Sequence, residues 1–271
     1  MTDAASLLSD LCDGVLTLTL NRPDVLNALN ATLVTELKTA LSNASLNPDV
    51  GVVVLRGAGR GFCAGGDLRS GAAARPAEQG EQPLDGFDAW SASLREAMEV
   101  SRMIHRFPMP TIAVLHGPTA GAGLSLAAAC DLRIAAQSAT FSTAFTKVGF
   151  SGDFGITYFL TRLVGTAKAR ELLFLSDKVD ATEAQRIGLV QKVVGDTELA
   201  ASVEELAARI ANGPRIAYRY MKKNLNTAEE GTLEQLLDLE ALHLTRTRYT
   251  EDHREAARAF AEKRPPAFKG R

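Results

Sequence analysis

Two apolar segments that each run into a glycine-rich turn constrain the fold of this chain more than any other feature. In one of them, residues 111–115 have the composition of a buried strand, and residues 124–129 are small and apolar helix formers. Gly121, Ala122 and Gly123 lie between them. Backbone N–H groups at the start of a helix have no intrahelical acceptor and lie at the positive end of the helix dipole, so this turn can receive an anion.

The residues around this turn narrow the choice of anion. A phosphate-binding loop would place a lysine beside the glycines, and no Lys or Arg occurs between His116 and Leu132. A dinucleotide fingerprint needs a third glycine, whereas Leu-Ser-Leu follows Gly123. An oxyanion hole uses the same backbone groups and needs neither feature. The alternative is that these glycines only allow the helix to pack tightly on the strand.

The second segment repeats this pattern earlier in the chain. Residues 51–56 read as a buried strand, and residues 57–68 form a turn that is rich in glycine. We expect the two turns to face one site. Strands that alternate with helical segments also predict an α/β fold with a mostly parallel sheet and crossover helices.

Composition excludes several classes of protein. The chain has 271 residues, 46% of them hydrophobic, which is ample for a sizeable core. Its formal net charge of -2 lacks the basic excess of a nucleic-acid-binding protein. Every apolar run is shorter than the roughly 18 residues that span a bilayer, and the N-terminus resembles neither a signal peptide nor a transit peptide. We therefore predict a cytoplasmic protein that binds neither nucleic acid nor membrane.

Several local elements can be predicted from capping residues and periodicity. Residues 15–20 alternate as in a half-buried strand, and Asn30 is placed to cap a helix whose apolar stripe contains Leu33, Leu37 and Leu41. Residues 70–86 are interpreted as a mobile loop beside the site or, alternatively, as a surface insertion.

Later segments are expected to be mainly helical. Helical spacing from Phe87 to Ile104 places Trp90 on a core-facing stripe. From Thr197 onward the chain is expected to be almost entirely helical, with capping boxes beginning at Thr232 and Asp252.

Several single polar residues could be either structural or catalytic, and the sequence favours a structural role for each. Cys12, Cys63 and Cys130 are far apart and are interpreted as reduced structural thiols, although a nucleophilic Cys63 is an alternative. His116 is more simply structural than catalytic, and Asp131 and Arg133 are interpreted as a structural ion pair rather than as catalytic groups.

Four segments, in this order, resemble the enoyl-CoA hydratase/isomerase (crotonase) family over residues 15–268. They are Phe-Cys-Ala-Gly-Gly-Asp-Leu at 62–68, Gly-Ala-Gly at 121–123, Ala-Cys-Asp-Leu-Arg-Ile-Ala at 129–135 and Arg-Ala-Phe-Ala-Glu-Lys-Arg at 258–264. The resemblance implies a crotonase-like α/β fold, a ββα-repeat core with a helical C-terminal region. We expect residues 1–196 to form the core with the CoA-thioester site and residues 197–271 to form a trimerisation or lid region. A homotrimer or homohexamer is expected.

The resemblance also implies roles for particular residues. The backbone N–H groups of Gly66 and Ala122 match the family's two oxyanion-hole positions. The residues expected to bind the CoA part of the substrate are Ala64, Asp67, Leu68 and Arg69 along its path, and Phe260 and Lys263 at adenine and phosphate. For Arg69 and Lys263 the alternative is a solvated surface charge.

The family's hydratases use two glutamates, and this chain carries Ser125 and Phe145 at the corresponding positions. Asp153 matches the position at which some relatives, isomerases among them, carry a single catalytic aspartate. A carboxylate there can act as a general base or acid. The alternative is that Asp153 only caps a helix beginning at Gly155.

The resemblance thus predicts an enzyme that moves the double bond of an acyl-CoA thioester through an enolate, with Asp153 carrying the proton. No metal or redox cofactor is expected, and coenzyme A enters as part of the substrate. Hydration of a 2-enoyl-CoA to a 3-hydroxyacyl-CoA is one alternative, and a catalytically silent acyl-CoA-binding or assembly protein is another. A hydrolase with Ser125 as nucleophile fits less well, because the nucleophile-elbow pattern needs a glycine where Ala127 stands.

Overall fold

The computed structural model describes residues 5–69 and 84–271. Its larger sheet has six strands in the order β1-β2-β3-β4-β6-β9. These strands are β1 Leu7–Cys12, β2 Val15–Leu20, β3 Val52–Gly57, β4 Thr111–Leu115, β6 Leu132–Ala136 and β9 Lys192–Val194. Only the β1–β2 pair is antiparallel, which confirms the prediction of a mostly parallel sheet.

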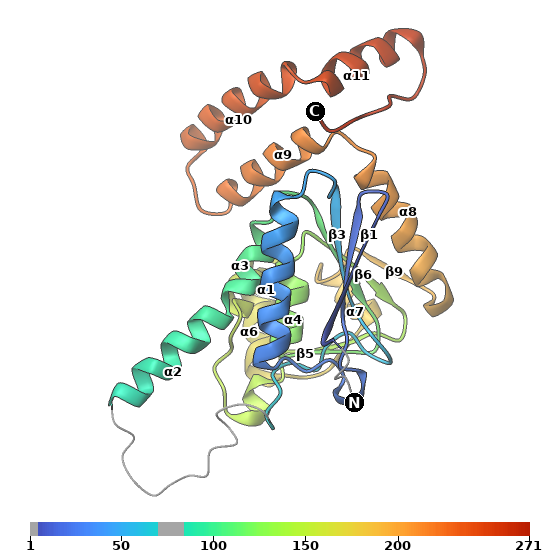
Figure 1. Cartoon of the computed structure of the whole chain (residues 1–271). Coiled ribbons are helices and arrows are strands. Elements are labelled where there is room, and N and C mark those ends of the chain that lie inside the picture. The colour runs from blue at the N-terminus through green and yellow to red at the C-terminus, as the bar shows by residue number, and fades with distance from the viewer. Residues whose placement is uncertain (1–4, 70–83) are drawn as a thin grey trace, which may run out of the picture.

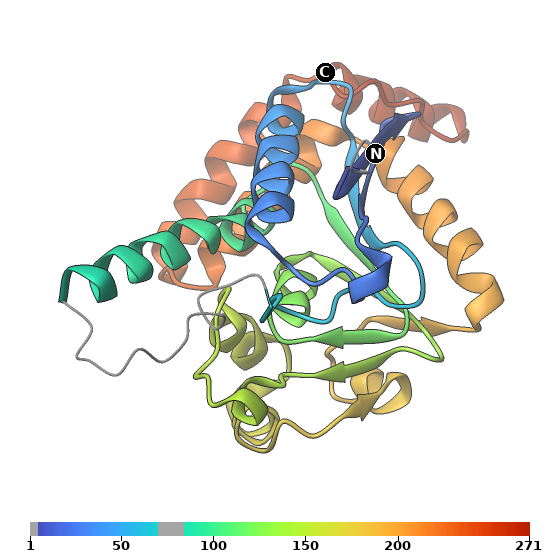
Figure 2. The ribbon, with the colours of Figure 1, turned by 60° about the horizontal axis from the view of Figure 1, so that its bottom comes forward.

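A smaller sheet joins β5 (Pro118–Ala120), β7 (Thr140–Ser142) and β8 (Val179–Asp180). In Figure 2, β5 and β7 cross the end of the larger sheet. This crossing brings the segment after β4 beside the turn after β3, because Cys63 in that turn pairs with Thr119 in β5.

Helices cover both faces of the larger sheet (Figure 1). The helices of the core are α1 Ala31–Leu46, α2 Leu84–Ala97, α3 Glu99–His105, α4 Ala122–Ala129, α5 Ile156–Leu163, α6 Gly165–Leu175 and α7 Ala181–Arg186. On one face Val53 and Leu55 belong to the hydrophobic core that includes α1, α3 and α4. On the other face Val52 and Val54 pack in a second core with α8. Burial on both faces explains why β3 reads as a continuous apolar run.

The C-terminal region is helical, as expected. It contains α8 Leu199–Ala211, α9 Arg215–Ala228, α10 Leu233–Arg248 and α11 Glu251–Glu262. In Figure 1, α10 and α11 lie at the end of the molecule opposite to β5. Within the part of the chain that the structure describes, no helix has the length and apolarity needed to cross a membrane.

Most local predictions are confirmed. Asn30 accepts a hydrogen bond from Leu33 N at 2.9 Å, and Leu33, Leu37 and Leu41 are buried on α1. The Thr232–Gln235 capping box opens α10. The loop expected over residues 70–86 lies outside the described residues up to position 83, and residues 84–86 already belong to α2.

Three local predictions are wrong. Trp90 is 49% exposed rather than part of the core. Helix α11 begins two residues before the predicted capping box, because Thr250 caps it by accepting from His253 N. Asp252 is used differently, since its carboxylate accepts the N–H groups of Lys269 and Gly270 and so binds the C-terminal tail to α11.

The third wrong prediction is the ion pair between Asp131 and Arg133. Asp131 pairs instead with Lys222 of α9, with 2.7 Å between Oδ2 and Nζ. The buried guanidinium of Arg133 donates to backbone carbonyls, including that of Leu189 at 2.8 Å. Both residues are structural, but the counter-charge of Asp131 comes from a helix 91 positions away in the chain, which local spacing cannot reveal.

Candidate active site

The two glycine-rich turns lie against each other. Cys63 N donates to Pro118 O at 3.3 Å, and Ala120 N donates back to Cys63 O at 2.9 Å. A Cβ atom on Gly65 would lie 3.5 Å from Ala122 N, and one on Gly123 would lie 2.5 Å from Cys63 O. The close approach of the turns therefore requires glycine at position 123, as the packing interpretation holds, whereas Gly65 is favoured by its positive φ of 104°.

Packing does not account for Gly66. A Cβ atom built on Gly66 would have no neighbour within 4 Å, so this residue borders open space. Its flanking groups are bonded to Leu29, since Leu29 N donates to Gly65 O and Asp67 N donates to Leu29 O. The described residues offer no acceptor to the Gly66 N–H itself. The turn thus holds Gly66 firmly and leaves its donor available.

Ala122 supplies a second donor of the same kind. It is the first residue of α4, and at that end Ser125 N donates to Gly121 O at 3.1 Å. The Ala122 N–H therefore has no acceptor within the helix and lies at the positive end of its dipole. Because Gly65 sits beside Ala122 N, the two donors border the same space.

Asp153 is held next to this helix end. Ser125 lies three residues after Ala122, about 4.5 Å along the helix axis, and its Oγ donates to the Asp153 carbonyl at 3.1 Å. Gly152, before Asp153, lies near the Phe145 ring, since a Cβ on that glycine would be 3.9 Å from Phe145 Cδ2. The chain therefore brings Asp153 between α4 and the ring of Phe145.

The Asp153 carboxyl group is poorly solvated. Its Oδ1 is buried and has no hydrogen-bond partner among the described residues. Burial raises the pKa of Asp153 to about 6. The carboxylate does not cap α5, because Gly155 is the N-cap without a side-chain bond and Ile156 N donates to the backbone oxygen of Asp153.

The backbone around Asp153 is unusual. Gly152, Phe154 and Gly155 all have positive φ, and Phe154 at φ 50° is the only one of the three with a side chain. A bulky residue in the left-handed region costs free energy that the surroundings must supply. Such strain is typical of segments that hold a functional group in place.

The remaining predicted residues fall into two groups. Ala64, Asp67, Leu68 and Arg69 follow one another in the turn that carries Gly66, with Leu68 and Arg69 exposed. Phe260, which is 89% exposed, and Lys263 lie on and just after α11, at the far end of the same chain (Figure 1). A single chain does not bring these two groups together.

Two residues that position the first turn escaped the sequence analysis. The amide of Asn27, fully buried at positive φ, donates to the carbonyls of Ala58 at 2.8 Å and Gly61 at 2.9 Å. Arg22 Nη2 pairs with Asp67 Oδ2 at 2.9 Å. Burial opposes ionisation of Asp67, but its bonds to Arg22 and to the Arg69 N–H outweigh burial and lower its pKa. The sequence signal that could have indicated Arg22 is the Asn-Arg-Pro segment at 21–23, directly after the strand at residues 15–20.

The alternative nucleophiles are buried and inert. Burial raises the pKa of Cys63 to about 12, so its thiol stays protonated. Ser125 is fully buried inside α4 with its hydroxyl bonded to backbone oxygens. His116 Nε2 lies 2.9 Å from Gly59 O, which gives it a structural contact.

Comparisons with known proteins identify the family and the fold of this chain. The family model described as enoyl-CoA hydratase/isomerase matches residues 11–271. The chain is 38% identical to a probable enoyl-CoA hydratase of Rhodobacter capsulatus, covering 97% of each chain. It is 36% identical to the 1,2-epoxyphenylacetyl-CoA isomerase of Escherichia coli, covering 98% of each. A crystal structure of a putative enoyl-CoA hydratase from Streptomyces coelicolor superposes with a TM-score of 0.91 at 38% identity, covering 100% of this chain and 97% of that one.

The chain therefore belongs to the enoyl-CoA hydratase/isomerase family and has the crotonase fold. It is an enzyme of this class.

Proposed function

We propose that this enzyme moves the double bond of an enoyl-CoA between the β,γ and α,β positions, with Asp153 as the only proton carrier. The observation that carries the proposal is the buried, unpartnered Oδ1 of Asp153 beside the first turn of α4. Ser125 and Phe145 occupy the positions of the family's two glutamates, and neither side chain can accept a proton as a carboxylate does.

The reaction can be written with atoms and electrons balanced. Asp153 takes a proton from the α carbon of a 3-enoyl-CoA, and the electron pair of that C–H bond passes into the thioester as an enolate. The N–H groups of Gly66 and Ala122 hold the oxygen where negative charge develops. Asp153 then returns the proton to the γ carbon, which leaves the 2-enoyl-CoA. Nothing is oxidised or reduced, so the proposed step needs no metal or redox cofactor.

The pKa of Asp153 suits this double role. A group that must both accept and return a proton works best when its pKa lies near the working pH. Burial raises the pKa of Asp153 to about 6, close to neutrality. The 1,2-epoxyphenylacetyl-CoA isomerase among the relatives supports isomerisation, whereas the probable enoyl-CoA hydratase supports hydration.

We also propose that the chain assembles as a homotrimer or homohexamer. Leu233, Leu237 and Leu244 of α10 are more than half exposed, and a second copy would cover them. In such an assembly Phe260 and Lys263 would reach the CoA of a neighbouring subunit. Sedimentation tests this directly, since a stable monomer at micromolar concentration would reject it.

The reaction itself is tested by offering the protein matched 3-enoyl- and 2-enoyl-CoA thioesters in H₂¹⁸O. The proposal predicts rapid conjugation of the 3-enoyl thioester, seen by its absorbance, with no ¹⁸O in the product. Rapid formation of labelled 3-hydroxyacyl-CoA would show hydration instead. Binding of both thioesters without any turnover would show a silent acyl-CoA-binding protein.

A further inference from the structure

A cavity of about 870 Å³ opens beside Asp153 between α3, the start of α5, α9 and the start of α10. Phe154 and Gly155, the two residues that follow Asp153, line it. Six of its lining side chains are cations: Arg95, Arg102, Arg106, Arg219, Lys222 and Lys223. The cavity therefore combines a position next to the proposed base with a strongly positive wall.

Part of this positive charge is already neutralised. Arg95 and Arg102 both pair with Glu99, and Lys222 pairs with Asp131 at 2.7 Å. For Arg106, Arg219 and Lys223, the described part of the chain places no carboxylate within ion-pair distance. These three cations are exposed at the cavity and retain their full charge.

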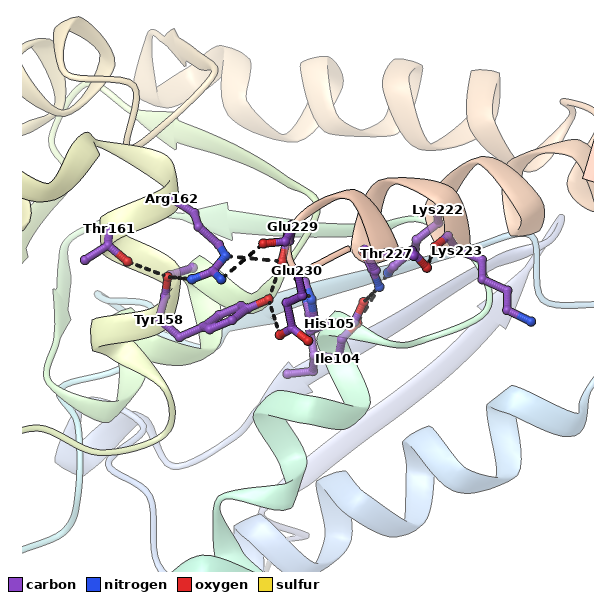
Figure 3. Close-up of polar contacts among 12 residues, drawn as sticks. Ile104, His105, Tyr158, Thr161, Arg162, Lys222, Lys223, Thr227, Glu229 and Glu230 are labelled. Atoms are coloured by element: carbon purple, nitrogen blue, oxygen red, sulfur yellow. Dashed lines mark hydrogen bonds and ion pairs between the residues drawn. The ribbon is translucent and has the colours of Figure 1, made fainter. Parts of the chain in front are cut away.

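One acid, Glu230, also lines the cavity, and its carboxylate accepts a hydrogen bond from Tyr158. Figure 3 shows Glu229 and Glu230, at the end of α9, directed at Tyr158 of α5. The Tyr158 hydroxyl lies 2.6 Å from Glu229 Oε2 and 3.1 Å from Glu230 Oε1. Glu229 also lies 3.4 Å from His105 Nε2 and 3.7 Å from Arg162 Nε. In the same view Lys223 extends away from both carboxylates, so it remains available to an anion.

The rest of the cavity wall is mixed: His105, Asn226, Thr227, Glu230 and Gln235 are polar, and one part is apolar and holds an unsatisfied group. Met98, Phe107, Phe154 and Phe159 line it. Ser101, only 3% exposed, also lines it, and its Oγ has no hydrogen-bond partner among the described residues. A buried hydroxyl without a partner costs free energy that a bound polar group can recover.

We infer that this cavity receives the far end of the acyl group and that this end carries an anionic group such as a carboxylate. The inference rests on the proposed function, because the acyl chain would enter past Asp153. The apolar walls at Phe154 and Met98 would pack against the chain. Arg219 and Lys223 would hold the terminal anion.

Two other sources of negative charge are distinguishable from this one. A free carboxylic acid would bind without a thioester, and the phosphates of CoA would bind whatever the acyl group. Of the three sources, only a carboxylate on the acyl group makes the affinity depend on the far end of the acyl chain. The comparison that matters is therefore between two thioesters that differ only at that end.

The test uses isothermal titration with saturated acyl-CoA thioesters of increasing length, each paired with its ω-carboxylated counterpart. Saturated thioesters are not substrates, so binding is measured even if the isomerase proposal fails. At the length that spans the site, the ω-carboxylated thioester should bind about tenfold more tightly, as expected for a charge-assisted hydrogen bond. The double variant Arg219→Gln, Lys223→Gln should lose this preference and retain the affinity for the uncharged thioester.

A matched control is Arg209→Gln, which removes an exposed cation of α8 away from the cavity and should leave the preference unchanged. Equal affinities for the paired thioesters at every length would overturn the inference and leave the proposed reaction standing. An equal loss of affinity for both thioesters in the double variant would also overturn the inference, because it would show that Arg219 and Lys223 bind the CoA part of the ligand. Tight binding of a free dicarboxylate in place of the thioester would reject the acyl source, and failure of every thioester to bind would reject the thioester site as well.

Discussion

Helices α4 and α10 represent two opposite kinds of surface in this molecule. Every residue of α4 is buried, whereas α10, twice as long, buries only His243. At α4, Ser125 Oγ donates to the backbone carbonyl of Asp153, so this residue is attached to the helix by a contact within one chain. At α10 and α11, leucines and Phe260 face outward with no contact from their own chain to cover them. Under the proposed function, one chain would build the reacting centre, while binding of the CoA end would depend on what covers the C-terminal helices.

The strongest test of the α4 side removes one backbone donor. Ala122→Pro deletes an N–H at the first position of a helix, where proline is tolerated. Loss of one oxyanion donor is expected to lower kcat by about 10²–10³-fold. Ala122→Gly keeps the donor and should retain most activity, and circular dichroism checks that both variants fold. Wild-type turnover by folded Ala122→Pro would remove Ala122 from the oxyanion hole.

The contact that attaches α9 to the core should contribute measurably to the free energy of unfolding. Lys222 of α9 is buried and donates to Asp131 at 2.7 Å and to the Met109 carbonyl at 3.2 Å. Lys222→Met leaves these acceptors unsatisfied and should lower the free energy of unfolding by about 1.5–3 kcal/mol in urea denaturation. Lys223→Met changes an exposed neighbour and should stay within about 0.5 kcal/mol of wild type. Equal stability of the two variants would show that α9 is not anchored through Asp131.

The pH dependence of the reaction should come from Asp153 and not from the C-terminal region. Since the base must be ionised, kcat/KM should fall about tenfold per pH unit below the pKa of Asp153, which is about 6. Because folding raises this pKa above its ordinary value of 3.8, the associated stability is present at acid pH and is lost as pH rises through about 6. Asp153→Asn should therefore be at least as stable as wild type above pH 6. A value of kcat/KM that does not change from acid to neutral pH would contradict the role of Asp153 as the base.

The smallest effect is expected at Phe260. Because this side chain is 89% exposed, Phe260→Ala should change the free energy of unfolding of the chain by less than about 0.5 kcal/mol. Loss of an aromatic contact with adenine, worth about 0.5–1.5 kcal/mol, should raise KM for the CoA thioester several-fold. The matching pantetheine thioester, which has no adenine, serves as the control. An equal rise in KM for both substrates would show that Phe260 does not contact the adenine.

The sequence predicted the fold and the two turns well, because these depend on local signals. Alternating apolar residues and the Asn30 cap act on neighbours that short-range patterns describe. The glycines at 65 and 123 are visible in the sequence as glycine-rich turns, although the atoms they approach belong to the other turn. The pairing of Asp131 with Lys222 and the anchoring of the first turn by Asn27 depend on partners far along the chain. The charged cavity beside Phe154 likewise combines residues from α3, α5 and α9, and only the fold brings them together.

The most direct test of the account follows hydrogen at the α carbon of the substrate. A 3-enoyl-CoA deuterated at the α carbon is incubated with wild type, Ala122→Gly and Asp153→Asn, and ²H NMR records the loss of deuterium from that carbon, whether it moves to the γ carbon or exchanges with water. The account predicts rapid loss with wild type and with Ala122→Gly, and almost none with a folded Asp153→Asn. Loss at the wild-type rate with Asp153→Asn would contradict it, because some other group would then be removing the proton.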